Sequence, residues 1–189
     1  MNILKPLIKL SGHIYLSKKP LFLLYKPKFH KLKGSEIRTI LNTLKNGDIL
    51  LRRYHGYLNT ILTPGYWGHA ALYVGRNKVI HAVSQGVVKE DILDFCRCDD
   101  IALIRIKDAS RDHIKNAITK ANQMEKEGLE YDYEFESGDR EVYCTELIDV
   151  AYGNIFDKDY VKKWGKNVIL PDKVYDSRRV EKVLAFKHK

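Results

Sequence analysis

The chain has 189 residues, of which 44% are hydrophobic and 30% are charged, and its formal net charge is +9. This composition predicts one globular domain with a substantial core and excludes a disordered or fibrous protein. The charge is local, because residues 1–34 hold eight lysines and no acid while the rest has 25 basic and 24 acidic side chains, and such a nearly neutral body argues against nucleic-acid binding.

Residues 1–34 form a basic, partly apolar N-terminal arm ahead of a domain that we expect over residues 35–189. The longest apolar run in the arm, residues 21–25, is far below the ~20 residues of a membrane-spanning helix. No signal-peptide cleavage site is evident, so we expect a cytoplasmic protein. The arm predicts either a peripheral anchor on an anionic membrane surface or a segment packed on the domain with its lysines in solvent, and the packed alternative is favoured.

The first predicted elements of the domain are a helix, a strand and a hairpin. Helical spacing of Ile37, Ile40, Leu41 and Leu44 predicts a helix capped by Ser35. Residues 48–53 predict a strand, and the aromatic loop over residues 53–68 is a candidate wall of a substrate cleft. Residues 69–74 and 79–83 predict a β-hairpin that turns at 75–78, and residues 101–106 predict a further strand.

The second half of the chain is predicted to be mainly helical. A long helix is expected between Ser110, its N-cap, and Gly128, its stop signal. A shorter helix begins at or near Cys144, because Cys144, Leu147, Ile148, Ala151 and Tyr152 fall on one helical face. Residues 180–186 predict a final strand. Helices and strands in this order indicate an α+β fold.

The three cysteines, Cys96, Cys98 and Cys144, do not form a disulfide framework, because their number is odd and their spacing unpaired. Such usage is typical of a reducing compartment. The Cys96–Cys98 pair lacks a second pair of ligands, and His69, His81 and Cys144 are widely spaced in the sequence. We therefore expect no metal and no cofactor.

Cys144 is the candidate nucleophile, because a thiol attacks as its thiolate and a helix N-terminus stabilises that anion. The same backbone N–H groups can receive the oxyanion of a tetrahedral intermediate. The chemistry also needs a histidine that faces the thiol.

The candidate bases are His13, His30, His55, His69, His81, His113 and His188. His69 stands out, because it opens the strongly apolar segment 68–75, whereas His13 and His30 lie in the arm and His188 lies at the end of the chain. A lone strand histidine is more often a hydrogen-bonded structural residue, so the pattern alone leaves both interpretations open.

Four motifs in order, GDILL, WGHAALYVG, VIHAVSQGV and YCTELI, resemble the permuted papain-like superfamily, especially its YiiX-type amidases. They are also similar to the lecithin:retinol acyltransferase-like proteins, and the resemblance covers about residues 45–150. It implies a permuted papain-like fold in which an antiparallel sheet packs against the helix that carries the cysteine. It further implies Cys144 as nucleophile, His69 as base and His81 as the third, orienting residue. YiiX-like relatives often have a carboxylate at the third position, so this sequence departs from that pattern.

Regular strand pairing gives His81 less support than the other two residues. A hairpin that turns at 75–78 sets His69 against Ser84 and leaves His81 near Leu72. A bulge or another register would be needed to bring the two imidazoles together. Ser84 and Gln85 therefore remain rival orienting groups.

Together these features predict a cysteine hydrolase that cleaves an amide or ester bond through an acyl-enzyme. The resemblance implies cell-wall peptides or acylated, lipid-linked molecules as substrates. Tyr54, Tyr66 and Tyr143 are candidate substrate-binding residues, although tyrosines on such elements more often pack. The alternatives are a thiol acyltransferase that acts on lipid and a non-catalytic ligand-binding module of the same fold.

Overall fold

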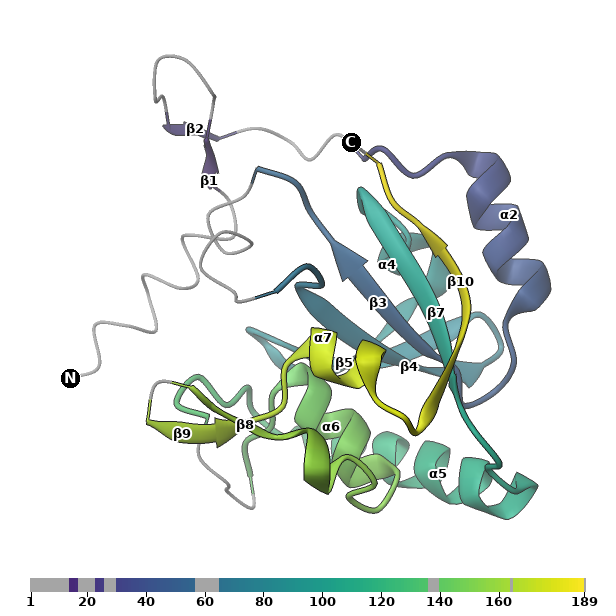
Figure 1. Ribbon diagram of the computed structural model, residues 1–189, viewed down its shortest axis with the longest axis vertical. Helices are drawn as coiled ribbons and strands as arrows, with labels where there is room; N and C mark the ends of the chain where they lie inside the picture. The colour runs from purple at the N-terminus through teal and green to yellow at the C-terminus, as the bar shows by residue number, and fades with distance from the viewer. Residues whose placement is uncertain are drawn as a thin grey trace.

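A six-stranded antiparallel sheet is the centre of the computed structural model, which describes residues 14–16, 23–25, 30–56, 65–135, 140–163 and 165–188 (Figure 1). Its strands are β3 (Ile49–Arg53), β4 (His69–Gly75), β5 (Lys78–Val83), β6 (Gly86–Asp91), β7 (Asp100–Ile106) and β10 (Val180–Phe186). They are ordered β10-β7-β3-β4-β5-β6. Every neighbouring pair runs antiparallel. The ends of β3 and β10 and the starts of β4 and β7 therefore meet at one end of the sheet.

Helices cover both faces of the sheet. They are α2 (Gly34–Thr43), α4 (Ile92–Phe95), α5 (Arg111–Glu127), α6 (Cys144–Ala151), α7 (Pro171–Asp176) and the short 3-10 helix η1 (Asp157–Asp159). Helices α5 and α6 pack on one face, and α2 and α4 pack on the other (Figure 1). Two small antiparallel pairs complete the described elements: β1 (Ile14–Leu16) with β2 (Leu23–Tyr25), and β8 (Val161–Lys163) with β9 (Lys166–Val168).

The two faces of the sheet bury separate apolar clusters. Along β3, Ile49 and Leu51 face the cluster beneath α5 and α6, whereas Leu50 faces the cluster beneath α2 and α4. All three side chains are fully buried. Central strands covered on both sides must be apolar at successive positions, which explains the unbroken ILL and AAL runs in the sequence.

The long amphipathic helix lies where its sequence signals predict. Ser110 caps α5 by accepting the N–H of His113 on its Oγ at 3.1 Å, and Gly128 ends it in the left-handed region at a φ of 66°. The strand predicted over 180–186 is confirmed as β10. The sequence patterns do not predict strand β6, helices α4 and α7 or the β8–β9 pair.

The N-cap of α2 is Lys33, so the prediction that Ser35 caps this helix is wrong. The side chain of Glu36 accepts the Lys33 N–H at 2.7 Å, which satisfies a donor at the helix start without a serine. Ser35 instead lies inside the first turn.

Most of the predicted arm and residues 57–64 of the aromatic loop lie outside the described residues. At the end of the arm, Leu32 is buried and its N–H donates to the Cys98 carbonyl at 3.2 Å, so this segment packs against the domain. Within the part of the chain that the structure describes, every helix is too short or too polar to cross a membrane.

Candidate active site

Cys144 is the first residue of α6, as the helical spacing predicts. Leu147 and Ile148 on the same face are fully buried and anchor the helix against the sheet. Thr145 fixes the first turn by donating its hydroxyl to the Ile169 carbonyl at 2.7 Å. These contacts hold the start of α6, and the backbone N–H groups of Cys144 and Thr145 lie near the thiol.

The Cys144 thiol is buried, and the backbone N–H groups of Ala70 and of the first turn of α6 favour its anion. Ala70 directly follows His69 on β4. The ladder between β4 and β5 is regular only as far as Leu72 and Ile80, so the Ala70 N–H lies beyond its end.

Burial raises the pKa of the Cys144 thiol above its ordinary value, although the surrounding N–H donors favour the anion. At neutral pH the resting cysteine is a neutral thiol. A nearby base must take its proton before it can act as a nucleophile.

His69 opens β4 opposite Arg52 of β3, and its Nε2 lies 2.8 Å from Nδ1 of His81. The predicted hairpin register is wrong by one residue, because β4 contains a bulge between Tyr73 and Gly75 and Leu72 pairs with Ile80. Continued along the strands, this pairing sets His81 opposite Ala71, two residues from His69 and on the same face of the sheet. The bulge therefore brings the two imidazoles together.

His81 is almost completely buried, at 2% exposure, and its ring packs against Phe95 at 5.5 Å between ring centroids. Its Nε2 lies 3.3 Å from Oε2 of Glu90 on β6. Burial lowers the pKa of His81 to about 3, and the Arg52 guanidinium contributes to that shift. Arg52 also lies 3.6 Å from the Glu90 carboxylate. His81 is accordingly neutral at physiological pH.

The rival orienting groups point elsewhere. Ser84 and Gln85 are exposed in the turn between β5 and β6, where the Ser84 hydroxyl donates to the Gln85 side chain at 3.0 Å. The Ser84 carbonyl accepts the Tyr133 hydroxyl at 3.2 Å. Of the three candidates for the orienting position, His81 is the one with a contact to His69.

The three candidate substrate-binding tyrosines occupy different environments. Tyr143 is buried at the N-cap of α6, where its hydroxyl accepts the Ile169 N–H at 3.0 Å. Tyr66 donates its hydroxyl to Asp100 at 2.6 Å. Tyr54 is half-buried, with its ring 5.4 Å from the Arg52 guanidinium. Packing and hydrogen bonding explain Tyr143 and Tyr66 without a ligand, and a substrate role for any of the three stays a prediction.

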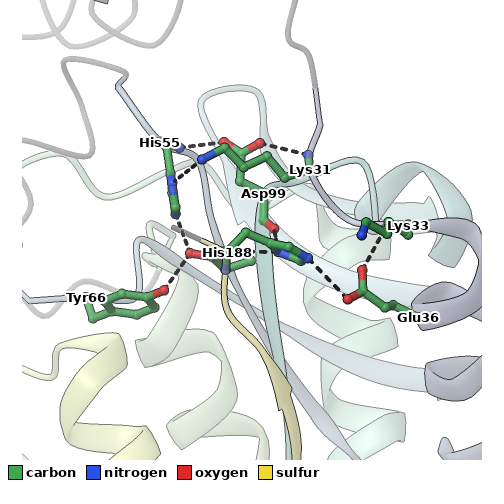
Figure 2. Close-up of polar contacts among 8 residues, drawn as sticks. Lys31, Lys33, Glu36, His55, Tyr66, Asp99 and His188 are labelled. Atoms are coloured by element: carbon green, nitrogen blue, oxygen red, sulfur yellow. Dashed lines mark hydrogen bonds and ion pairs between the residues drawn. The ribbon is translucent and has the colours of Figure 1, made fainter. Parts of the chain in front are cut away.

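A second polar cluster lies at the same end of the sheet, around Asp99 and Asp100 at the start of β7 (Figure 2). Asp100 is fully buried and accepts hydrogen bonds from Tyr66, from His55 and from the His188 N–H at 2.7 Å. Asp99 accepts the backbone N–H groups of Lys31 and His55 at 3.0 and 2.6 Å.

His188, which its position near the C-terminus made an unlikely candidate base, belongs to this cluster. Its ring nitrogens contact the Asp99 carbonyl at 2.7 Å and Glu36 at 3.2 Å. The cluster thereby joins the end of the N-terminal arm, the start of the aromatic loop and the C-terminus to the edge of β7 (Figure 2).

The remaining cysteines are buried in the cluster beneath α2 and α4. Burial raises the pKa of Cys96 to about 12 and that of Cys98 further still. In the described ranges, no three histidine, cysteine or acidic side chains are placed to hold a metal ion. The His69 and His81 nitrogens face each other at 2.8 Å, shorter than the roughly 3.3 Å between two nitrogens on a tetrahedral zinc, and so do not fit a shared metal.

Comparison with known proteins gives a structural and a family match. A solved structure of YiiX from Escherichia coli O157:H7, described as a metalloprotein, superposes with a TM-score of 0.64 at 18% identity, covering 77% of this chain and 99% of that one. At this identity the match shows a shared fold. No curated protein matches the sequence. The family model of the permuted papain-like amidases matches residues 43–184, about three quarters of the chain. The chain therefore belongs to the permuted papain-like amidase family, the YaeF/YiiX or C92 family.

Proposed function

We propose that this protein is a cysteine hydrolase in which Cys144 is the nucleophile, His69 the general base and His81 the residue that orients His69. The observation that carries the proposal is the 2.8 Å contact between His69 and His81, because Ala70, the residue after His69 on β4, has a backbone N–H that favours the Cys144 thiolate. A nucleophile at a helix N-terminus, a base and a group that orients the base are the parts that thiol acyl chemistry needs.

In the first half-reaction, His69 takes the Sγ proton and the thiolate attacks the substrate carbonyl carbon. The backbone N–H of Cys144 stabilises the oxyanion of the tetrahedral intermediate. The C–N or C–O bond then breaks, and the His69 imidazolium protonates the departing amine or alcohol. Cys144 is left as a thioester with the acyl group.

In the second half-reaction, His69 takes a proton from water and the hydroxide attacks the thioester carbonyl. The C–S bond breaks, the carboxylic acid leaves, and the proton returns from His69 to the Cys144 sulfur. The substrate is a small peptide or an acylated molecule, and contact of residues 1–34 with a membrane surface would favour lipid-linked forms. An alcohol or amine in place of water would make the same acyl-enzyme a transferase.

The first test is selective alkylation of Cys144 with stoichiometric iodoacetamide across pH, read by intact mass and peptide mapping. We expect Cys144 to react faster than Cys96 and Cys98 below pH 8 and to lose this advantage in His69→Ala. The matched control is His113→Ala, because His113 is a half-buried histidine that contacts the Tyr152 carbonyl at 3.0 Å, away from the site. Equal reactivity of the three cysteines, or an unchanged rate in His69→Ala, would refute the proposal.

The second test is turnover of activated acyl esters and peptide amides, with Cys144→Ala as the inactive reference. A thioester mass on Cys144 after a substrate pulse identifies the acyl-enzyme. Adding an alcohol or amine acceptor and measuring the mass of the product by mass spectrometry then distinguishes hydrolysis from acyl transfer. Turnover that persists in Cys144→Ala would place the chemistry elsewhere.

A further inference from the structure

The orienting residue is itself held by a pair of charged side chains from two other strands. The carboxylate of Glu90 on β6 lies 3.3 Å from His81 Nε2 and 3.6 Å from the Arg52 guanidinium on β3. The contact with His81 is electrostatic rather than an aligned hydrogen bond. No local sequence pattern indicates these contacts, because Arg52, His81 and Glu90 are far apart along the chain and are brought together only by the order of the strands in the sheet.

The Arg52 guanidinium is fixed by its own contacts. It lies over the ring of Phe95 at 4.2 Å and donates from Nη1 to the Phe95 carbonyl at 3.3 Å. The same ring packs against both His69 and His81. A cation held in this way places the Glu90 carboxylate and offsets its charge, so that His81 is not drawn into the imidazolium form.

A neutral His81 has two tautomers, and the two contacts of its ring select between them. With the proton on Nδ1, Nε2 would carry a partial negative charge 3.3 Å from a carboxylate oxygen, which is repulsive. With the proton on Nε2, that contact is attractive and Nδ1 can only accept. The 2.8 Å contact then requires His69 to donate from Nε2, which places the lone pair of His69 on Nδ1.

We infer that Glu90, held by Arg52, is a positioning residue that fixes His81 as the Nε2–H tautomer and thereby sets which nitrogen of His69 is basic. Glu90 touches neither the thiol nor a reacting atom. The tautomer assignment rests on the two contacts of a buried, neutral His81 ring, and its consequence for Cys144 rests on the proposed function. The charged and titratable groups that face His81 include His69 on β4, Glu90 on β6 and Arg52 on β3.

The test combines nitrogen-15 NMR of the histidine rings, alkylation of Cys144 as a function of pH, and thermal melting. In the wild type we expect His81 to be protonated at Nε2 and neutral down to pH 5. Glu90→Gln keeps an oxygen that can turn toward the Nε2–H but loses the negative charge, so it should retain the tautomer only in part and slow alkylation by less than Glu90→Leu. Glu90→Leu should yield a mixture of His81 tautomers and slow alkylation at pH 7 by about tenfold or more, part of the roughly 10²–10⁴-fold that a positioned base contributes.

The matched control is Glu125→Leu. Glu125 has the same 32% side-chain exposure as Glu90 and also pairs with a cation, Lys89 of β6, at 3.4 Å. This variant should leave the NMR signals of His81 and the alkylation rate unchanged, so a purely structural cost of losing a half-buried acid is separated from the tautomer effect.

Two results would overturn the inference: a wild-type His81 protonated at Nδ1, or an unchanged tautomer and alkylation profile in Glu90→Leu. The wild-type spectrum decides the first point even where a variant fails to fold. If alkylation proves insensitive to His69→Ala while the tautomer follows Glu90, the proposed function fails and the positioning role of Glu90 stands.

Discussion

The buried carboxylate of Asp100 offers a quantitative test of the cluster that joins both chain ends to the sheet. In Asp100→Asn, the amide oxygen can replace Oδ2 and still accept from Tyr66 and His55. The amide nitrogen then faces the His188 N–H, a donor that Oδ1 accepts at 2.7 Å in the wild type. One half-buried donor is left unsatisfied, at about 1–3 kcal/mol, and the remaining bonds lose their charge assistance. We expect Asp100→Asn to lower the free energy of unfolding by about 2–4 kcal/mol at pH 7.

The stability cost of Asp100→Asn should decrease as the pH falls, because the hydrogen bonds favour the ionised carboxylate. Donors from Tyr66, His188 and His55 hold the pKa of Asp100 below its ordinary 3.8 in the folded protein, against the effect of burial. Stability from the ionised carboxylate is therefore complete above about pH 4 and is lost as the pH falls through the lower folded-state pKa.

Urea unfolding of wild type and Asp100→Asn at pH 7 and at pH 3 measures this difference. The difference in the free energy of unfolding between the two proteins should be smaller at pH 3 than at pH 7. Asp94→Asn is the control, because this exposed carboxylate is 4.0 Å from Arg97 and should change stability by less than about 0.5 kcal/mol. A gap of equal size at both pH values would refute the reasoning, because the carboxylate charge would then not be its source.

Three further predictions follow from groups around α6 and β7. Tyr143→Phe leaves the buried Ile169 N–H without its acceptor and should cost about 1–3 kcal/mol in chemical unfolding, and a cost below about 0.5 kcal/mol would contradict the packing role of this hydroxyl. Burial raises the pKa of Glu146 to about 7, so ionisation of Glu146 destabilises the folded protein increasingly as the pH rises from about 4.5 to 7. Glu146→Gln should therefore raise the melting temperature at pH 8 but not at pH 5. An equal effect at both pH values would count against the raised pKa. Cys96 and Cys98 should resist iodoacetamide at pH 8 in the native protein and react in urea, and rapid native labelling would show that their burial is not maintained.

Local sequence signals predicted the elements that carry the site. The amphipathic spacing from Cys144 onward placed this residue at the start of α6, and Ser110 and Gly128 set the limits of α5. These features are local, because a helical face repeats within one segment and a cap bonds to its own first turn. The cap of α2 was missed, since Glu36 can satisfy the helix start by reaching back to Lys33 and no serine is needed.

The residues by themselves determined the fold class, the position of Cys144 on its helix and the hairpin that carries His69 and His81. Only the tertiary structure decided that the two imidazoles meet, because a one-residue bulge between Tyr73 and Gly75 shifts the strand register and so moves His81 onto the face of His69. The pairing of Glu90 with His81 is likewise a contact between neighbouring strands. Such contacts depend on register and strand order, which are set by the packing of the whole sheet between its helices and leave no pattern within any one segment.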